Sequence, residues 1–437
     1  MKNLRFKSLL ILACFFAVSI LPLNAQEIHQ GTGLVTVNVL VSESRLSDAA
    51  IAAALQSASP APFTQINSLG GFGRPSSNTA YGKRLYSLTL LPSYANRFLR
   101  AVRSTPNVLL AEQEQIGYAN MDPNDPYYGL QWGLPKVEAP AGFDIEMGNS
   151  EVVIAIVDTG VDLDHPDLVS KLLPGYDAVD GDSVPEDVNG HGTRMAGIAT
   201  ATTMNNQGIA GMCPNCKLLP LRAGYPNSTF SASKVFLAVE YALDNPRGIE
   251  GIPDNPNPAD VISLSASFPG ESDYLLWSVE DAAALNVPFV ASAGNQGWDG
   301  PRYPAAYDNV ISVAATDQND QRYSNSNYGD WVTLAAPGVD IWTTSLNGTY
   351  ATSTGTSPAA PLVAGTIALM RSRAVNMTLS PDDIRDILIA SSDPVYGFPD
   401  IVGGRLNARA ALELTPNGHT PPYIPRFKKP FPMSDGG

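Results

Sequence analysis

Apolar and polar residues follow two different patterns along this 437-residue chain, and the pattern changes after about residue 118. Before that point, short runs of alternating apolar and polar residues predict strands at 34–41, 85–91 and 108–112, with a weaker strand at 63–69. Helical spacing predicts helices at 46–56 and 93–103. This order of elements is typical of a small α+β, ferredoxin-like unit, a split βαβ sandwich, which we assign to residues 26–118.

In residues 119–414 the apolar runs are continuous and separated by helical stretches. The turn-rich segment MDPNDPYYG at 121–129 is typical of an exposed linker. Beyond it we expect strands at 151–157, 261–264, 288–292 and 310–314, and helices at 191–203, 231–242, 272–285, 358–371, 381–390 and 407–414. Strands buried on both faces and linked by helices predict an α/β fold, a parallel sheet flanked by helices. Functional side chains of such folds gather at the carboxyl ends of the strands.

The two ends of the chain have compositions of their own. Lys2, Arg5 and Lys7 precede an apolar run at 9–23 and the small residue Ala25, so residues 1–25 are expected to be a secretory signal. A membrane anchor, or lipidation at Cys14, is the alternative. No later run is long enough to span a bilayer, and we therefore expect a secreted, periplasmic or extracellular protein without a membrane segment after signal removal. The proline-rich residues 415–437 are expected to be disordered.

Charge and cysteine content exclude several functional classes. The 42 acidic residues against 27 basic ones give a net charge of −15, which argues against a nucleic-acid partner. Outside the expected signal only Cys213 and Cys216 remain, too few for a structural zinc site. In an oxidising compartment the two are expected to form a disulfide, and two inert thiols are the alternative.

Candidate chemistry rests on three residues that are far apart in the sequence. Of the four histidines, His165 precedes a proline and is expected in a turn, whereas His191 begins a helix in NGHGTRMAG. Asp158 ends a buried strand, and Ser357 lies directly before a helix, where the helix dipole helps to stabilise an oxyanion. A serine nucleophile needs a base to take its proton and a carboxylate to orient that base. Asp158, His191 and Ser357 together supply this set.

Four sequence motifs of the chain resemble those of a known family. VDTGVDLDHPDL, NGHGTRMAG, ASAGN and GTSPAAPLVAG resemble the motifs of the subtilisin-like serine peptidases, the subtilases of peptidase family S8. The order of acid, base and nucleophile is the known order of subtilisin. The resemblance implies a triad of Asp158, His191 and Ser357, with Asn295 donating to the oxyanion. It also implies a serine endopeptidase that acts on proteins and peptides, with residues 26–118 as an intramolecular chaperone and inhibitor.

The resemblance extends to the substrate site, with departures. VISLSASF is similar to the substrate-binding strand of the family, in which Leu and Gly stand where this chain has Ala266 and Ser267. Pro358 follows the nucleophile, and a proline restricts the backbone of the residue before it. These departures keep a second hypothesis open, a catalytically inactive subtilase-fold binding module. The substrate-binding candidates are Ser265, Ala266, Ser267, Ser292, Ala293 and Gly294.

No cofactor is needed for the chemistry, but the resemblance implies a structural calcium ion. Asp125, Asp167 and Asn206 stand in matching segments and carry the hard oxygen ligands that Ca²⁺ prefers. Surface acids without a metal are the alternative. The sequence has no signal for oligomerisation, so a monomer is expected.

Overall fold

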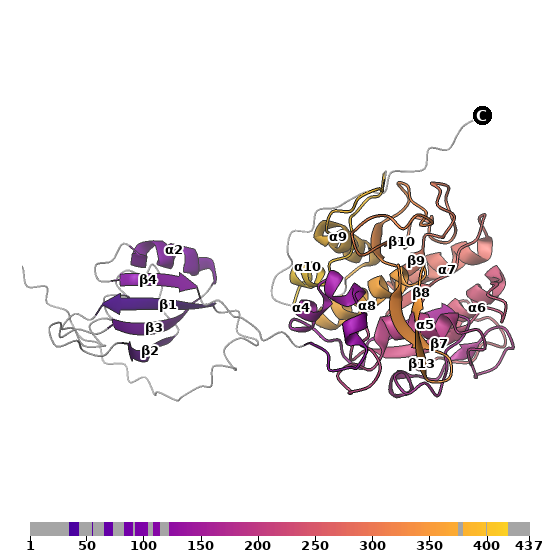
Figure 1. Ribbon diagram of the computed structural model, residues 1–437, viewed down its shortest axis with the longest axis horizontal. Coiled ribbons are helices and arrows are strands. Elements are labelled where there is room, and N and C mark those ends of the chain that lie inside the picture. The colour runs from indigo at the N-terminus through magenta and orange to yellow at the C-terminus, as the bar shows by residue number, and fades with distance from the viewer. Residues whose placement is uncertain are drawn as a thin grey trace, which may run out of the picture. The chain divides into compact units, whose positions relative to one another are not determined.

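The computed structural model describes residues 35–42, 55, 65–72, 83–90, 92–103, 108–113, 122–374, 379–398 and 400–417. Contacts within the chain divide it into two units, residues 1–117 and 118–437, which are described separately (Figure 1). The expected signal at 1–25, most of the expected helix at 46–56 and residues 418–437 of the expected tail lie outside the described residues.

The first unit contains an antiparallel sheet covered by a helix. Its elements are β1 (Val35–Ser42), β2 (Gln65–Phe72), β3 (Lys83–Leu90), α2 (Pro92–Arg103) and β4 (Val108–Gln113). The strand order is β2-β3-β1-β4, and every neighbouring pair is antiparallel. Val37, Val39 and Val41 of β1 are buried in one cluster with Phe98 and Val102 of α2. Alternation along β1 thus gives one apolar face, and the strand order is that of a split βαβ sandwich.

The second unit is built on a parallel sheet of seven strands, as the sequence predicts. Their order is β11-β10-β9-β8-β5-β7-β6, and all neighbours run parallel. The strands are β5 (Val153–Asp158), β6 (Tyr176–Asp177), β7 (Lys217–Arg222), β8 (Val261–Leu264), β9 (Phe289–Ser292), β10 (Val310–Thr316) and β11 (Leu334–Pro337).

Helices cover both faces of this sheet and create two apolar cores (Figure 1). Helices α5 (His191–Thr200) and α8 (Ala359–Arg373) belong to one core, and α6 (Ala232–Ala242) and α7 (Asp273–Ala284) to the other. Along β5, Ile154 and Ile156 enter the first core, while the odd-numbered residues 153–157 enter the second. Because side chains alternate along a strand, residue 158 faces the first core, where α5 lies.

The remaining elements lie around these layers. They are η2 (Tyr128–Leu130), α3 (Gly133–Lys136), α4 (Ala139–Phe143), η3 (Val169–Lys171), the hairpin of β12 (Ile341–Ser345) and β13 (Thr349–Ser353), α9 (Pro381–Ser391) and α10 (Ala408–Leu414). A capping box at Ser380 and Asp383 begins α9, as the serine before the expected helix suggests. Among the described residues no helix has the length and apolar character to span a membrane.

Several element boundaries differ from the prediction by one to three residues, and two of these differences have a local cause. The helix expected at 191–203 ends at Thr200, because the chain turns extended at Ala201 and takes positive φ angles at Met204 and Asn206. Pro358, expected as the first residue of α8, is instead its N-cap, and the helix begins at Ala359.

The structure joins Cys213 and Cys216 in a disulfide between Cα atoms 5.5 Å apart. Both residues are fully buried in the core that contains α5 and α8. Gly148, with φ of 82°, packs against the bond so closely that a Cβ there would lie 2.4 Å from Sγ of Cys213. A side chain at residue 148 would therefore displace the disulfide loop.

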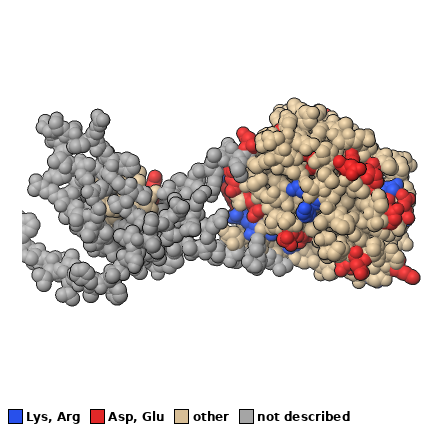
Figure 2. Space-filling model, turned by 90° about the horizontal axis from the view of Figure 1, so that it is seen from below, with Lys and Arg blue, Asp and Glu red and all other residues tan. Residues whose placement is uncertain are grey.

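Acidic side chains are spread around the second unit. Figure 2 shows them at several separate places on one face, with basic side chains at fewer places. This distribution is the surface expected for a chain with a net charge of −15.

Candidate active site

An aspartate and a histidine meet at the carboxyl end of the central strand. Asp158 is the last residue of β5 and is 1% exposed, and His191 is the first residue of α5. Nδ1 of His191 lies 2.6 Å from Oδ1 of Asp158. A carboxylate only accepts hydrogen bonds, so Nδ1 carries the proton and Nε2 of the neutral ring keeps its lone pair. That tautomer is the one a general base needs.

The surroundings of His191 favour its protonated form. Burial by itself lowers the pKa of the imidazole, but the charge of Asp158 and its hydrogen bond, with a contribution from Asp187, outweigh burial and raise the pKa above the ordinary 6.5. The ring therefore accepts a proton readily and stabilises it once bound.

Glycines allow the helix to come this close to the strand. A Cβ on Gly192 would lie 2.1 Å from the carbonyl oxygen of Gly160 and 3.0 Å from Cβ of Asp158. Gly160 itself has φ of 104°, a conformation that favours glycine. The close packing of α5 on the end of β5 thus depends on the absence of a side chain at residue 192.

A second buried carboxylate, which the sequence analysis missed, fixes the loop before His191. Asp187 is 4% exposed, and its Oδ1 accepts from the Thr159 hydroxyl at 2.9 Å and from the backbone N–H of Gly190 at 2.8 Å. Its Oδ2 accepts from the N–H and the hydroxyl of Thr193, at 2.9 and 2.7 Å. The only feature of the sequence that pointed to Asp187 was the position of an acidic residue four places before His191. Asp187 connects the end of β5 to the first turn of α5.

The nucleophile candidate Ser357 lines the same cleft as the histidine. The Ser357 hydroxyl donates to the carbonyl oxygen of Ser265 at 3.4 Å, and the Ser265 hydroxyl donates to the carbonyl oxygen of Ser357 at 2.9 Å. His191 and Ser357 line the same hollow of about 440 Å³. Within the described part of the chain no hydrogen bond joins these two side chains, so proton transfer requires the hydroxyl to rotate from Ser265 toward Nε2.

Asn295 has an amide donor, Nδ2, with no hydrogen-bond partner among the described residues, and it bonds to Thr356 directly before this serine. Its Oδ1 accepts from the backbone N–H of Thr356 at 2.8 Å and from the Thr356 hydroxyl at 3.1 Å. Because a backbone N–H must face an oxygen, these bonds fix the amide orientation and leave Nδ2 as the outward donor on an exposed residue. Gly355, with φ of 145°, leaves room for it, since a Cβ there would lie 3.1 Å from Nδ2.

The substrate-binding candidates separate into two groups. Ser265, Ala266 and Ser267 line the hollow that contains His191 and Ser357. Ser292 and Ala293 are buried outside that lining, and the N–H of Gly294 donates to the Thr356 hydroxyl at 3.0 Å. The second group, residues 292–294, thus directly precedes Asn295 in the chain and does not line the hollow.

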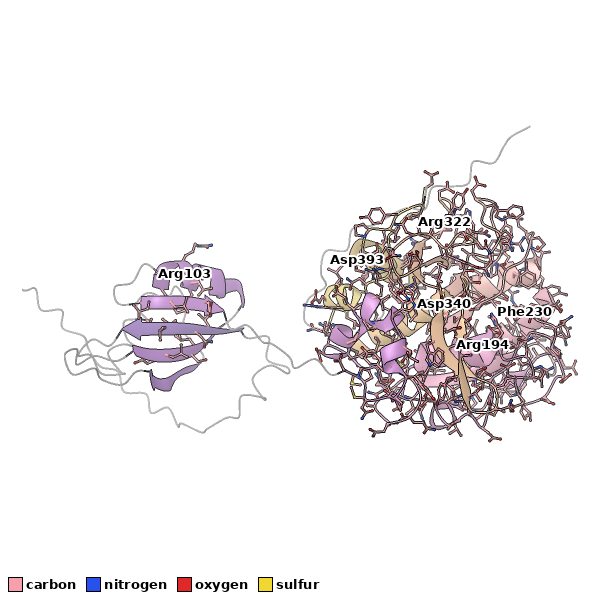
Figure 3. All side chains as sticks on the ribbon, in the orientation of Figure 1. Arg103, Arg194, Phe230, Arg322, Asp340 and Asp393 are labelled. Carbon is pink, nitrogen blue, oxygen red and sulfur yellow. A yellow bond between two sulfur atoms is a disulfide. The ribbon has the colours of Figure 1, made fainter. Side chains whose placement is uncertain are left out.

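Two aromatic residues of the cleft were not anticipated. Phe230, labelled in Figure 3 on the same side of the unit as Arg194 of α5, and Phe268 both line the hollow. Both belong to loops, where hydrophobic periodicity gives no signal.

The expected metal residues surround one loop. Asp125 is 4% exposed and accepts from the N–H of Met204 at 2.9 Å, and Asp167 is fully buried and lies 2.9 Å from Nδ2 of Asn205. The amide beside Asp167 is therefore that of Asn205, whereas the backbone N–H of Asn206 donates to Asn124.

This set of donors fits a hard cation. Burial raises the pKa of both carboxyl groups, which is the expected consequence when neither has a cation beside it. Carboxylate oxygens are ligands that Ca²⁺ prefers, whereas the Asn205 amide turns its nitrogen to Asp167 and its oxygen accepts from the backbone N–H of Gln207. In the described ranges no group of three or more His, Cys, Asp or Glu side chains could hold a metal, so backbone oxygens would have to complete the shell.

His165 has a structural role. It is fully buried, its Nε2 lies 3.0 Å from the carbonyl oxygen of Thr349, and its Nδ1 accepts from the N–H of Asp167. Its hydrogen bonds connect the Asp167 turn to strand β13.

Comparisons with known proteins identify the family of this chain. A model of the subtilase family matches residues 149–414. The chain is 41% identical over 293 residues to thermitase from Thermoactinomyces vulgaris, covering 67% of this chain and 99% of that protein. It is 40% identical over 316 residues to a thermophilic serine proteinase from Bacillus sp. (strain AK1), covering 72% of this chain and 75% of that protein.

A solved protease structure from Pseudoalteromonas arctica is also similar, with a TM-score of 0.63 and 30% identity over 68% of this chain and 100% of that chain. The family match covers more than half of the residues, and two relatives are 40% and 41% identical to this chain over the aligned residues. The chain therefore belongs to the subtilase family of serine peptidases.

Proposed function

We propose that the protein is a secreted serine endopeptidase in which Asp158, His191 and Ser357 act as the catalytic triad and Asn295 as the oxyanion donor. The observation that carries the proposal is the 2.6 Å contact between Asp158 and Nδ1 of His191, with His191 and Ser357 in one cleft. Its substrates are proteins and peptides.

The reaction is acyl transfer in two halves. The Ser357 hydroxyl rotates to His191, gives its proton to Nε2 and bonds to the carbonyl carbon of the peptide. Asp158 stabilises the imidazolium, and Nδ2 of Asn295 with the backbone N–H of Ser357 donates to the oxyanion. The C–N bond then breaks as Nε2 protonates the leaving amine. Water attacks the acyl-enzyme by the same route and releases the acid and the free serine.

The protein is further proposed to be made as a precursor. Residues 1–25 direct export, and residues 26–118 assist folding and inhibit the enzyme until the chain is cut between about Glu114 and Asp125. The division of contacts into two units supports this part. N-terminal sequencing of the active form should find a start between these two residues, and an active form that begins at residue 26 would contradict it.

A calcium ion held by Asp125, Asp167 and Asn206 is the third part of the proposal. The ion would supply positive charge between two buried carboxylates and stabilise the loop that follows α5. It takes no part in the peptide-bond chemistry.

An inactive binding module is the second candidate. It is favoured by the hydrogen bond of the Ser357 hydroxyl to Ser265 instead of His191, and by Pro358 directly after the serine. Covalent labelling by a fluorophosphonate separates the two candidates. We expect labelling of the wild type and none of Ser357→Ala. Equal labelling of Ser357→Ala, or none of the processed wild type, would overturn the enzyme proposal.

A further inference from the structure

A polar hollow of about 450 Å³ lies apart from the cleft, and the proposed mechanism does not use it. It is lined by residues of four segments, namely the loop before β5, η3, the segment after α5 and the disulfide loop that leads into β7. None of its lining residues lines the hollow of His191 and Ser357.

Two lysines provide the charge of this hollow. Lys171 is only 7% exposed, and its Nζ donates to the carbonyl oxygen of Pro214. Lys217 is half-buried, and its Nζ donates to the carbonyl oxygen of Ser170 at 3.0 Å. Across the described residues, neither lysine forms an ion pair with an acidic side chain.

Among the described residues no paired carboxylate balances the positive charges of Lys171 and Lys217. Burial and the neighbouring Lys217 lower the pKa of Lys171 to about 8, and no carboxylate contributes to that shift. Two ammonium groups in a partly desolvated hollow repel each other, and a bound anion would remove that repulsion.

The remaining lining supplies neutral hydrogen-bond donors around the two charges. Ser150, Ser170, Thr202 and Asn215, whose side chains can donate hydrogen bonds, line the same space. The Ser170 and Thr202 hydroxyls lie 2.9 Å apart, so one of them is free to donate outward. Donors from several directions match an anion with several oxygens better than a planar carboxylate.

We propose that the hollow between Lys171 and Lys217 binds a small, doubly charged oxyanion of the phosphate or sulfate type. The bound anion connects η3, the disulfide loop and the start of β7, and therefore stabilises the catalytic unit from a site remote from the cleft. The proposal does not depend on peptidase activity.

The test is isothermal titration calorimetry of the full chain carrying Ser357→Ala, which prevents self-digestion, with inorganic phosphate at pH 7.5 and constant ionic strength. We expect one saturable site, with sulfate bound similarly and acetate at least about tenfold more weakly. Lys217→Gln should weaken phosphate binding about tenfold or more, because it removes one of the two charges, and Lys217→Arg should retain it.

Lys234→Gln is the matched control, because Lys234 is also half-buried and donates to a backbone carbonyl, at 3.3 Å, but lines a different region. Its phosphate affinity should equal that of the parent. The proposal is overturned if phosphate gives no saturable binding, if Lys217→Gln binds as tightly as Lys234→Gln, or if acetate binds as tightly as phosphate. Circular dichroism of each variant verifies that the comparison is made between folded proteins.

Discussion

The role of Asn295 provides the sharpest test of the proposed chemistry. Replacing it with Ala removes the outward Nδ2 donor, and it also removes the Oδ1 that accepts from the N–H and hydroxyl of Thr356. In subtilisin, where the effect was measured, loss of such a donor lowers kcat by about 10²–10³, equivalent to about 2.7–4 kcal/mol. Thr356 is fully buried, so its orphaned N–H should in addition cost about 1–3 kcal/mol of folding stability.

Asn295→Asp separates these two effects. Aspartate keeps an oxygen toward Thr356 but has no donor for the oxyanion, so it should retain the thermal stability of the wild type while losing at least as much kcat as Asn295→Ala. Both variants are assayed for kcat and KM on a peptide amide, with active sites counted by fluorophosphonate labelling. KM should change little, because the donor acts mainly in the transition state. Unchanged kcat in both variants, with Ser357 still labelled, would refute the assignment.

Three further predictions concern the histidine, the glycine beside it and the metal. The value of kcat/KM should rise with pH, because only neutral His191 acts as a base. The midpoint of the rise should lie above the ordinary pKa of 6.5 for histidine, because Asp158 favours the protonated ring. A midpoint below 6.5 would contradict this. Gly192→Ala should leave little folded enzyme, since its Cβ would lie 2.1 Å from a backbone oxygen; normal expression and activity would disprove the packing argument. Chelation of calcium should lower the melting temperature of the wild type and change that of Asp167→Asn much less; equal shifts would argue against a cation at this loop.

Local patterns were sufficient for much of the architecture. Continuous apolar runs predicted the strands that became β5, β8, β9 and β10, because strands buried on both faces have no polar side. The helix starts at Ser380 and Asn407 were also visible, since a capping side chain bonds within its own first turn. The short strands β6 and β11 and the hairpin of β12 and β13 were not predicted, because few residues in them show any periodicity.

The residues that position the site were harder to foresee. The Asp187 carboxylate bonds to residues on both sides of it in the sequence, and its effect depends on the folded path of the loop before α5. No pattern in the sequence indicated that the amide of Asn205 bonds to Asp167, in a loop where Met204 and Asn206 on either side of it have positive φ angles. Such angles are set by the packing of the whole loop.

Sequence alone therefore determined the alternation of strands and helices, the edge of the sheet where Asp158 emerges, and the family whose motifs surround His191 and Ser357. These features depend on burial and on spacing along the chain, and both can be inferred from residues that are close together in the sequence. Only the tertiary structure decided that Nδ1 of His191 meets Asp158 at 2.6 Å, that the Ser357 hydroxyl bonds to Ser265, and that Lys171 and Lys217 share one hollow. Those contacts join segments from 33 to 92 residues apart, and their geometry depends on how glycines and loops let separate elements approach.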